Sequence, residues 1–155
     1  MQLDETAAPR QRERGALRQR VLVAEDDADF RALVGAALSL DDYDIVEVDD
    51  GRDLRAIIEA VGAGSAGAFD VIVADVHLPG GTAIDVLASA LRGWLTTPVI
   101  LMTGHCDQHV HLAADWLGVA CVLEKPFELH DLRAAVARFA RRARPQWTRR
   151  RARFD

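Results

Sequence analysis

The sequence predicts an α/β fold in which a parallel sheet of five strands lies between two layers of helices. Four short apolar runs are continuous rather than alternating, which is typical of strands covered on both faces. Between these runs, apolar residues recur at the spacing of amphipathic helices. Because strands alternate with helices in a (βα)5 order, we expect right-handed crossovers and a three-layer sandwich.

The predicted strands are short. The continuous apolar runs lie at residues 21–24, 71–74, 99–102 and 119–123. A fifth run, at residues 44–48, mixes charged with β-branched residues and therefore predicts an edge strand.

Each predicted helix shows one apolar stripe. The stripes are Phe30, Leu33, Val34, Ala37 and Leu38; Leu54, Ile57, Ile58 and Val61; Ile84, Leu87, Ala88 and Leu91; Val110, Ala113, Ala114 and Leu117; and Leu129, Leu132, Val136 and Phe139. Thr82 and Asp85 have the spacing of a capping box at the third helix. Trp94 and Trp116 stand near helix ends, and we expect them to cover the core.

Length and composition favour one soluble domain in the cytoplasm. The chain has 155 residues and is 50% hydrophobic and 28% charged, which excludes a disordered or collagen-like protein. No apolar run reaches the roughly 18 residues of a membrane helix, and the Arg-rich start shows no secretory signal. Two cysteines are too few for a disulfide framework.

The net charge of −5 is unevenly distributed. Residues 1–20 carry +2, residues 21–140 carry −13, and residues 141–155 carry +6. We therefore expect a basic arm at 1–19, a domain at 20–143 and an Arg-rich tail at 144–155. The tail is interpreted as a soluble extension, although contact with nucleic acid, anionic lipid, an acidic partner or the acidic body stays open.

Polar residues follow several of the predicted strands. Glu25 and Asp26 follow the run at 21–24, and Asp75 follows the run at 71–74. Thr103 follows the run at 99–102, and Lys125 comes shortly after the run at 119–123. Because ligands bind at the carboxyl ends of strands in an open parallel sheet, these side chains are expected to converge on one rim.

Clustered carboxylates repel one another unless a hard cation or a shared proton relieves the repulsion. Mg²⁺ suits such a cluster, and Lys125 with Thr103 would then face an anion. This combination matches phosphoryl transfer, in which catalysis is mostly positioning and charge neutralisation. A carboxylate such as that of Asp75 is a known class of nucleophile for this transfer.

Four motifs in order carry a family resemblance: VLVAEDD at 21–27, VIVADVHLPG at 71–80, PVILMTG at 98–104 and VLEKPF at 122–127. Over residues 20–143 the sequence resembles the CheY-like receiver domains of two-component response regulators. The resemblance implies a flavodoxin-like (βα)5 sandwich with the parallel strand order 2-1-3-4-5.

By this resemblance, Asp75 accepts a phosphoryl group from a phosphohistidine of a histidine kinase or phosphotransfer protein. Mg²⁺, or Mn²⁺ in its place, would be held by Glu25, Asp26, Asp75 and the backbone carbonyl of His77. Thr103 and Lys125 would each bind a phosphoryl oxygen. The protein is not expected to be an enzyme beyond the self-catalysed phosphorylation and dephosphorylation of Asp75.

The resemblance also predicts two smaller features, and the sequence departs from the family pattern at two positions. Asp27 is expected to cap the first helix, and the Lys125–Pro126 bond is usually cis in the family. Val122 stands where the family usually has an aromatic, and Ala83 where it often has glycine. A valine has no ring to relocate, so the usual coupling to the face around the fifth strand is in question.

The function we predict is a stand-alone phospho-acceptor, because residues 144–155 leave no room for an output domain. Output would be protein–protein contact or phosphorelay, by a monomer or weak dimer. The alternatives are nucleic-acid binding by the tail and an aspartyl-phosphate hydrolase. Such hydrolases typically carry a second acid two residues after the nucleophile, where this sequence has His77, which disfavours the hydrolase. A nucleotide or flavin module is disfavoured by the acids at 26–29, which would repel phosphate.

Two further groups suggest sites. His105, Cys106, His109 and His111 invite a zinc hypothesis, but their spacing matches no standard closed site, and we interpret them as surface. His105 alone could lie near the phosphoryl group and alter its hydrolysis. The remaining acidic residues around the second strand are interpreted as a solvated rim: Asp41, Asp42, Asp44, Asp49, Asp50 and Asp53.

Overall fold

The computed structural model describes residues 18–105 and 108–142, in which five strands and five helices alternate. The strands are β1 (Arg20–Ala24), β2 (Asp44–Val48), β3 (Val71–Asp75), β4 (Val99–Thr103) and β5 (Cys121–Glu124). The helices are α2 (Ala28–Ser39), α3 (Gly51–Gly62), α4 (Ala83–Gly93), α5 (Gln108–Leu117) and α6 (Leu129–Arg142). The N-terminal arm up to residue 17 and the tail at 144–155 lie outside the described residues, so the predicted domain boundaries stay a prediction.

The strands form one parallel sheet in the order β2-β1-β3-β4-β5, which confirms the predicted flavodoxin-like arrangement. β2 is an edge strand, as predicted. β5 is the other edge, and its residues Cys121–Leu123 are only partly buried. Both faces of β5 are nevertheless covered, as predicted: Cys121 and Leu123 pack in the layer of α2 and α6, and Val122 packs in the layer of α3, α4 and α5.

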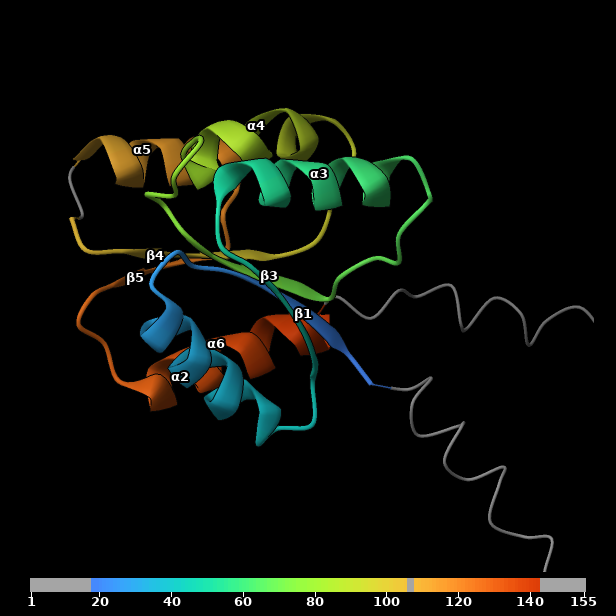
Figure 1. The fold of residues 1–155 in the computed structure, drawn as a ribbon. Coiled ribbons are helices and arrows are strands. Elements are labelled where there is room, and N and C mark those ends of the chain that lie inside the picture. The colour runs from blue at the N-terminus through green and yellow to red at the C-terminus, as the bar shows by residue number, and fades with distance from the viewer. Residues whose placement is uncertain (1–17, 106–107, 143–155) are drawn as a thin grey trace, which may run out of the picture.

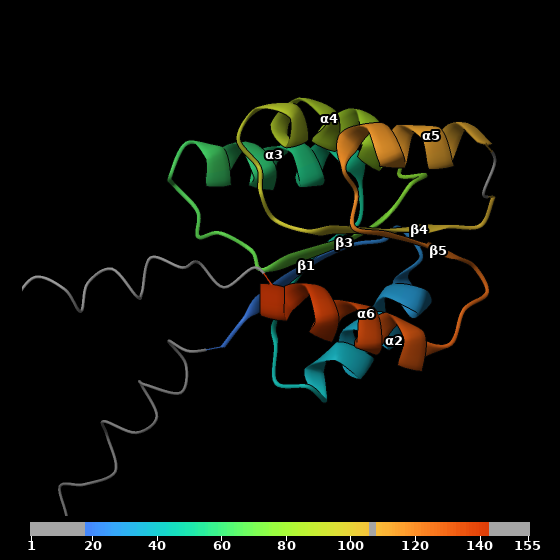
Figure 2. The same cartoon turned by 180° about the vertical axis from the view of Figure 1, so that it is seen from behind.

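Two layers of helices cover the sheet (Figures 1 and 2): α2 and α6 lie on one face, and α3, α4 and α5 on the other. Side chains alternate between the faces along each strand. In β1, Val21 and Val23 pack in the layer of α2 and α6, whereas Leu22 and Ala24 pack in the layer of α3, α4 and α5. The continuous apolar runs of the central strands follow from this double burial.

Side chains that precede three helices accept hydrogen bonds from their first turns. Asp27 Oδ1 accepts from the Phe30 N–H at 3.0 Å, which confirms the predicted cap of α2. Thr82 Oγ1 accepts from the Asp85 N–H at 3.1 Å, as the capping-box spacing predicts. The Asp27 cap starts α2 directly after the carboxyl end of β1, where the predicted site lies.

Three side chains predicted to be buried are exposed. Leu33 is 54% exposed because it lies about 100° around α2 from the buried Val34, at the margin of the apolar stripe. Trp116 is 75% exposed, since its position on α5 is nearly opposite the buried Val110 and Ala114. Trp94 is 47% exposed, with its ring against Gly62 of α3. Among the described residues, no helix combines the length and apolar character of a membrane span.

Candidate functional site

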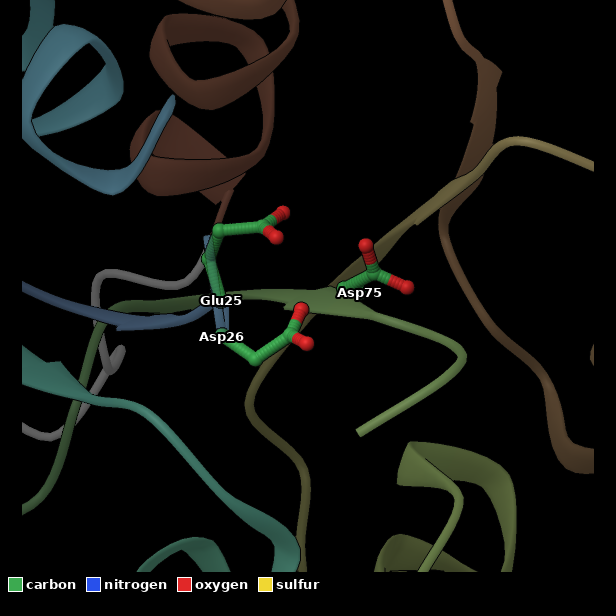
Figure 3. A group of neighbouring side chains, drawn as sticks. All are labelled: Glu25, Asp26 and Asp75. Atoms are coloured by element: carbon green, nitrogen blue, oxygen red, sulfur yellow. The ribbon is translucent and has the colours of Figure 1, made fainter. Parts of the chain in front are cut away.

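The carboxyl ends of β1, β3 and β5 meet at one rim of the sheet and bring four of the predicted residues together. Glu25 and Asp26 follow β1, Asp75 is the last residue of β3, and Lys125 follows β5. Figure 3 shows Glu25 and Asp26 extending toward Asp75. The three carboxylates each place an oxygen within 4.8 Å of the other two.

Hydrogen bonds fix both oxygens of the Asp75 carboxylate. Oδ1 accepts from the backbone N–H of His77 at 2.8 Å, and Oδ2 accepts from Lys125 Nζ at 2.6 Å. The Asp75 side chain is 9% exposed. The Asp75 carboxylate is thus held in one orientation at the carboxyl end of β3, with the Lys125 ammonium beside it.

Glu25 is the most deeply buried acid of the group, with a side chain that is 1% exposed. Its Oε2 accepts from Lys125 Nζ at 2.9 Å, and its Oε1 accepts from the Asp27 N–H at 3.2 Å. Burial raises the pKa of Glu25 above its ordinary value, and the Asp75 charge adds to the increase. The two hydrogen bonds oppose this increase without cancelling it.

Lys125 joins the two buried acids. Burial alone lowers the pKa of its ammonium, but the hydrogen bonds to Asp75 and Glu25 outweigh burial, so the pKa of Lys125 is raised. The ammonium therefore keeps its charge across the neutral range. The site holds three carboxylates and one ammonium, which pairs with two of them, so an excess of negative charge remains.

The donor set fits a hard divalent cation. Mg²⁺ prefers oxygen ligands at about 2.1 Å, so that ligands on opposite sides of the ion lie about 4.2 Å apart. The spacing of the three carboxylates, within 4.8 Å, accommodates this arrangement, and the excess negative charge favours it. Glu25, Asp26 and Asp75 would hold the ion, with the carbonyl of His77 as the further ligand that the family resemblance implies.

A second acidic group has similar spacing. Asp49, Asp50 and Asp53 also place oxygens within 4.8 Å of one another. Asp49 and Asp53 are exposed, and Asp50 uses its carboxylate to cap α3 through the Asp53 N–H at 2.7 Å. This geometry agrees with the interpretation of these acids as a solvated rim.

Thr103 ends β4 beside these groups and is fully buried. Its hydroxyl donates to the His105 carbonyl oxygen at 2.9 Å and accepts from the His105 N–H at 3.2 Å. Its carbonyl accepts from the Lys125 N–H at 2.7 Å, so the backbones of the threonine and the lysine are directly linked. The structure thus places Thr103 at the rim with its hydroxyl turned to the following loop.

A family model describing the response regulator receiver domain matches residues 21–137. The chain belongs to the response regulator receiver family. The curated relatives of this receiver domain include the transcriptional regulatory protein TcrA of Mycobacterium tuberculosis, 34% identical over 123 residues, 79% of this chain and 46% of that protein. FixJ of Bradyrhizobium diazoefficiens, also a transcriptional regulatory protein, is 31% identical over 125 residues, 81% of this chain and 58% of that protein. The chain spans about half the length of these relatives.

Solved structures agree with the receiver fold. A signal receiver domain from Vibrio parahaemolyticus is 31% identical with a TM-score of 0.72, and the match covers 82% of this chain and 93% of that chain. A CheY-like receiver domain protein from Methanospirillum hungatei shares the fold with a TM-score of 0.73 at 18% identity, over 81% of this chain and 96% of that chain.

The structure locates the two departures from the family pattern. Val122 lies on β5, partly buried, and packs against the apolar layer of α3, α4 and α5. Ala83 is fully buried at the start of α4, and its N–H donates to the Val76 carbonyl at 3.0 Å. The Lys125–Pro126 peptide bond is cis, as the resemblance implies.

One contact at the receiver site was not predicted. The Phe30 ring, on α2, lies with its centroid 4.5 Å from Lys125 Nζ. Phe127 meets this ring edge-on, with centroids 5.9 Å apart and planes at 70°. The periodicity of α2 identifies Phe30 as a core-facing residue, but no signal in the sequence shows that the core at this point includes a lysine.

The four residues of the zinc hypothesis are described in part. Cys106 lies outside the described residues. His105 and His109 are exposed, and His111 Nε2 lies 3.5 Å from Glu124 Oε1. Among residues 18–105 and 108–142, no group of three possible ligands includes a histidine.

Proposed function

We propose that this receiver domain is a phospho-acceptor, and that Asp75 takes the phosphoryl group from a phosphohistidine of a histidine kinase or phosphotransfer protein. The observation that supports this proposal most directly is the Asp75 carboxylate. It is nearly buried, held at both oxygens by His77 and Lys125, and surrounded by two further acids. A cation that binds these acids would bring the phosphoryl group and the acceptor together.

In the transfer, an oxygen of Asp75 attacks phosphorus while the bond from phosphorus to the donor imidazole breaks. The electron pair of that bond leaves with the imidazole nitrogen. In the later hydrolysis of the aspartyl phosphate, water attacks phosphorus, the bond between phosphorus and the Asp75 oxygen breaks, and inorganic phosphate leaves. Hydrolysis regenerates the free Asp75 carboxylate, and no activity beyond these two steps is proposed.

The bound cation would neutralise charge on the phosphoryl oxygens, which is the chief electrostatic need of this reaction. Glu25 and Asp26 would hold it, and Asp75 would orient against it. Lys125 now contacts Asp75 Oδ2 at 2.6 Å and would transfer this contact to a phosphoryl oxygen. Thr103 would reach another oxygen by rotating its hydroxyl away from His105, giving up a contact worth about 1 kcal/mol.

Output by contact with a protein partner, or by passing the phosphoryl group onward, is part of the same proposal. The two charges gained at Asp75 would draw Thr103 and Lys125 toward the phosphoryl group and so bias a two-state equilibrium. Thr103 is joined through His105 to the loop that leads into α5. This loop is one route by which the movement could reach the surface.

The proposal is tested by incubation with acetyl phosphate and Mg²⁺, followed by intact-mass measurement. Wild type should gain the mass of one phosphoryl group, and Asp75→Asn should gain none. Omission of Mg²⁺ should prevent the gain, as should Asp26→Asn. Equal gain in wild type and Asp75→Asn would overturn the assignment of the acceptor.

The hydrolase alternative is distinguished in the same samples. A phosphatase would turn over a phosphate ester steadily without a phosphorylated donor, whereas a receiver domain would release phosphate only at the rate at which its own aspartyl phosphate hydrolyses. We expect no steady turnover of a phosphate monoester, measured as released inorganic phosphate.

A further inference from the structure

The Lys125 ammonium has three neighbours in the described part of the site: Asp75 Oδ2, Glu25 Oε2 and the Phe30 ring. Asp75 is the last residue of β3 and Glu25 directly follows β1, whereas the ring comes from α2. The centroid of the ring is 4.5 Å from Nζ, within the range of about 6 Å in which an aromatic face attracts a cation. The ring is thus a third, uncharged partner of the ammonium.

Phe127 fixes the ring in place. Its edge-to-face contact with Phe30 ties α2 to the loop that follows Lys125. Both rings are partly buried and pack in the apolar layer of α2 and α6. The orientation of the Phe30 face toward the lysine is therefore set by packing and does not depend on the charge of the acids.

The contact matters because one carboxylate partner of the ammonium, Asp75, changes during the reaction. One Asp75 oxygen becomes bonded to phosphorus, and Lys125 must then turn from the carboxylate to a phosphoryl oxygen. Phe30 is not altered by the reaction and can hold the ammonium near the acceptor throughout. Without this contact, only the hydrogen bond to Glu25 at 2.9 Å would restrain the ammonium of a long side chain that is 25% exposed.

We propose that Phe30 is a positioning residue for phosphoryl transfer: its ring holds the Lys125 ammonium over Asp75 and thereby increases the rate of phosphorylation. This inference rests on the proposed function of Asp75 as the acceptor. The contribution of a partly desolvated cation–π contact corresponds to about three- to tenfold in rate.

The test measures the rate of Asp75 phosphorylation by acetyl phosphate over a range of donor concentrations. Phe30→Leu, which keeps an apolar side chain but removes the ring, should lower the maximal rate about three- to tenfold. Phe30→Tyr, which keeps the ring face, should stay near wild type. Phe139→Leu is the matched control, because Phe139 is also partly buried in the layer of α2 and α6 but belongs to the far part of α6.

Two measurements separate positioning from a structural effect. Pentafluorophenylalanine at position 30 keeps the shape of the ring but reverses the charge of its face, and should lower the rate as Phe30→Leu does. Phe30→Leu should have no effect in a Lys125→Met background, because the ring then has no ammonium to hold. The first measurement stays informative if Phe30→Leu does not fold.

The proposal is overturned if the pentafluorophenylalanine protein reacts at the wild-type rate, or if Phe30→Leu slows the Lys125→Met protein as much as it slows wild type. A failure of the underlying function looks different: wild type itself would gain no phosphoryl group, or Asp75→Asn would gain it equally.

Discussion

Replacement of Lys125 by methionine would leave two buried carboxylates without their shared cation. Methionine has a similar length and apolar stem, so the substitution removes the ammonium and preserves most of the packing. In a buffer without divalent cations, no other group in the described site faces both Glu25 and Asp75 with positive charge. We therefore expect Lys125→Met to be clearly less stable than wild type at neutral pH.

The magnitude follows from two hydrogen bonds between charged groups, at 2.6 and 2.9 Å. Breaking a buried ion pair by removing one partner destabilises a protein by about 3–5 kcal/mol. Because the Lys125 side chain is 25% exposed, water screens part of the interaction, and we expect about 2–3 kcal/mol. With a slope of about 2 kcal/mol per molar urea, the unfolding midpoint should fall by roughly 1 M.

The difference should depend on pH in a defined way. The pKa of Lys125 is raised on folding, so its stabilisation is complete below its ordinary value of 10.5 and is lost as pH rises through the folded pKa. The pKa of Glu25 is also raised, so protonation of this acid as pH falls toward its ordinary value of 4.5 relieves the unpaired charge in the variant. The two proteins should converge in stability at both ends of the pH range.

The assay is urea unfolding of wild type and Lys125→Met across this pH range. Arg55→Met, which removes an exposed cation from α3, is the control and should shift stability by less than about 0.5 kcal/mol. Addition of Mg²⁺ should stabilise Lys125→Met, because the ion replaces the missing positive charge. Equal midpoints at neutral pH, or a difference that does not vary with pH, would refute the electrostatic reasoning.

Three other predictions concern single contacts. Asp50→Ala removes the side chain that caps α3 and should cost about 1 kcal/mol in urea unfolding, without changing Mg²⁺-dependent phosphorylation. Asp41→Asn breaks the ion pair with Arg133, which lowers the pKa of Asp41. The small stabilisation from this pair is present above the ordinary pKa of 3.8 and is lost as pH falls through the folded pKa. Wild type and Asp41→Asn should therefore become equally stable in acid, as measured by urea unfolding. His105→Ala should change the half-life of the phosphoryl group on Asp75, and an unchanged half-life would discard a role for this side chain.

The sequence was sufficient for the fold and for the rim of the sheet. Apolar runs that alternate with helical stripes have few compact solutions, and a parallel sheet places every strand's carboxyl end at the same edge. The residues after the runs at 21–24, 71–74 and 119–123 were therefore expected at one edge, and Glu25, Asp75 and Lys125 are in contact there. No side-chain geometry was needed for this prediction.

Side-chain orientation was harder to predict. A helical stripe identifies the buried face only to within one residue at its margin, so Leu33 was assigned to the core and is exposed. The hydroxyl of Thr103 could turn to a ligand or to its own backbone, and the fold alone does not choose between them. In the structure it pairs with His105.

Val122, which stands where the family usually has an aromatic residue, also shows that side-chain contacts are hard to predict from sequence. The sequence indicates that β5 carries no ring, and the structure places Val122 in the layer of α3, α4 and α5. The rings that lie at the site, Phe30 and Phe127, belong to the layer of α2 and α6, on the other face of the sheet. Aromatic contact with the lysine is therefore present, but it is supplied by Phe30 of α2, which is distant in sequence from the strand that carries Val122.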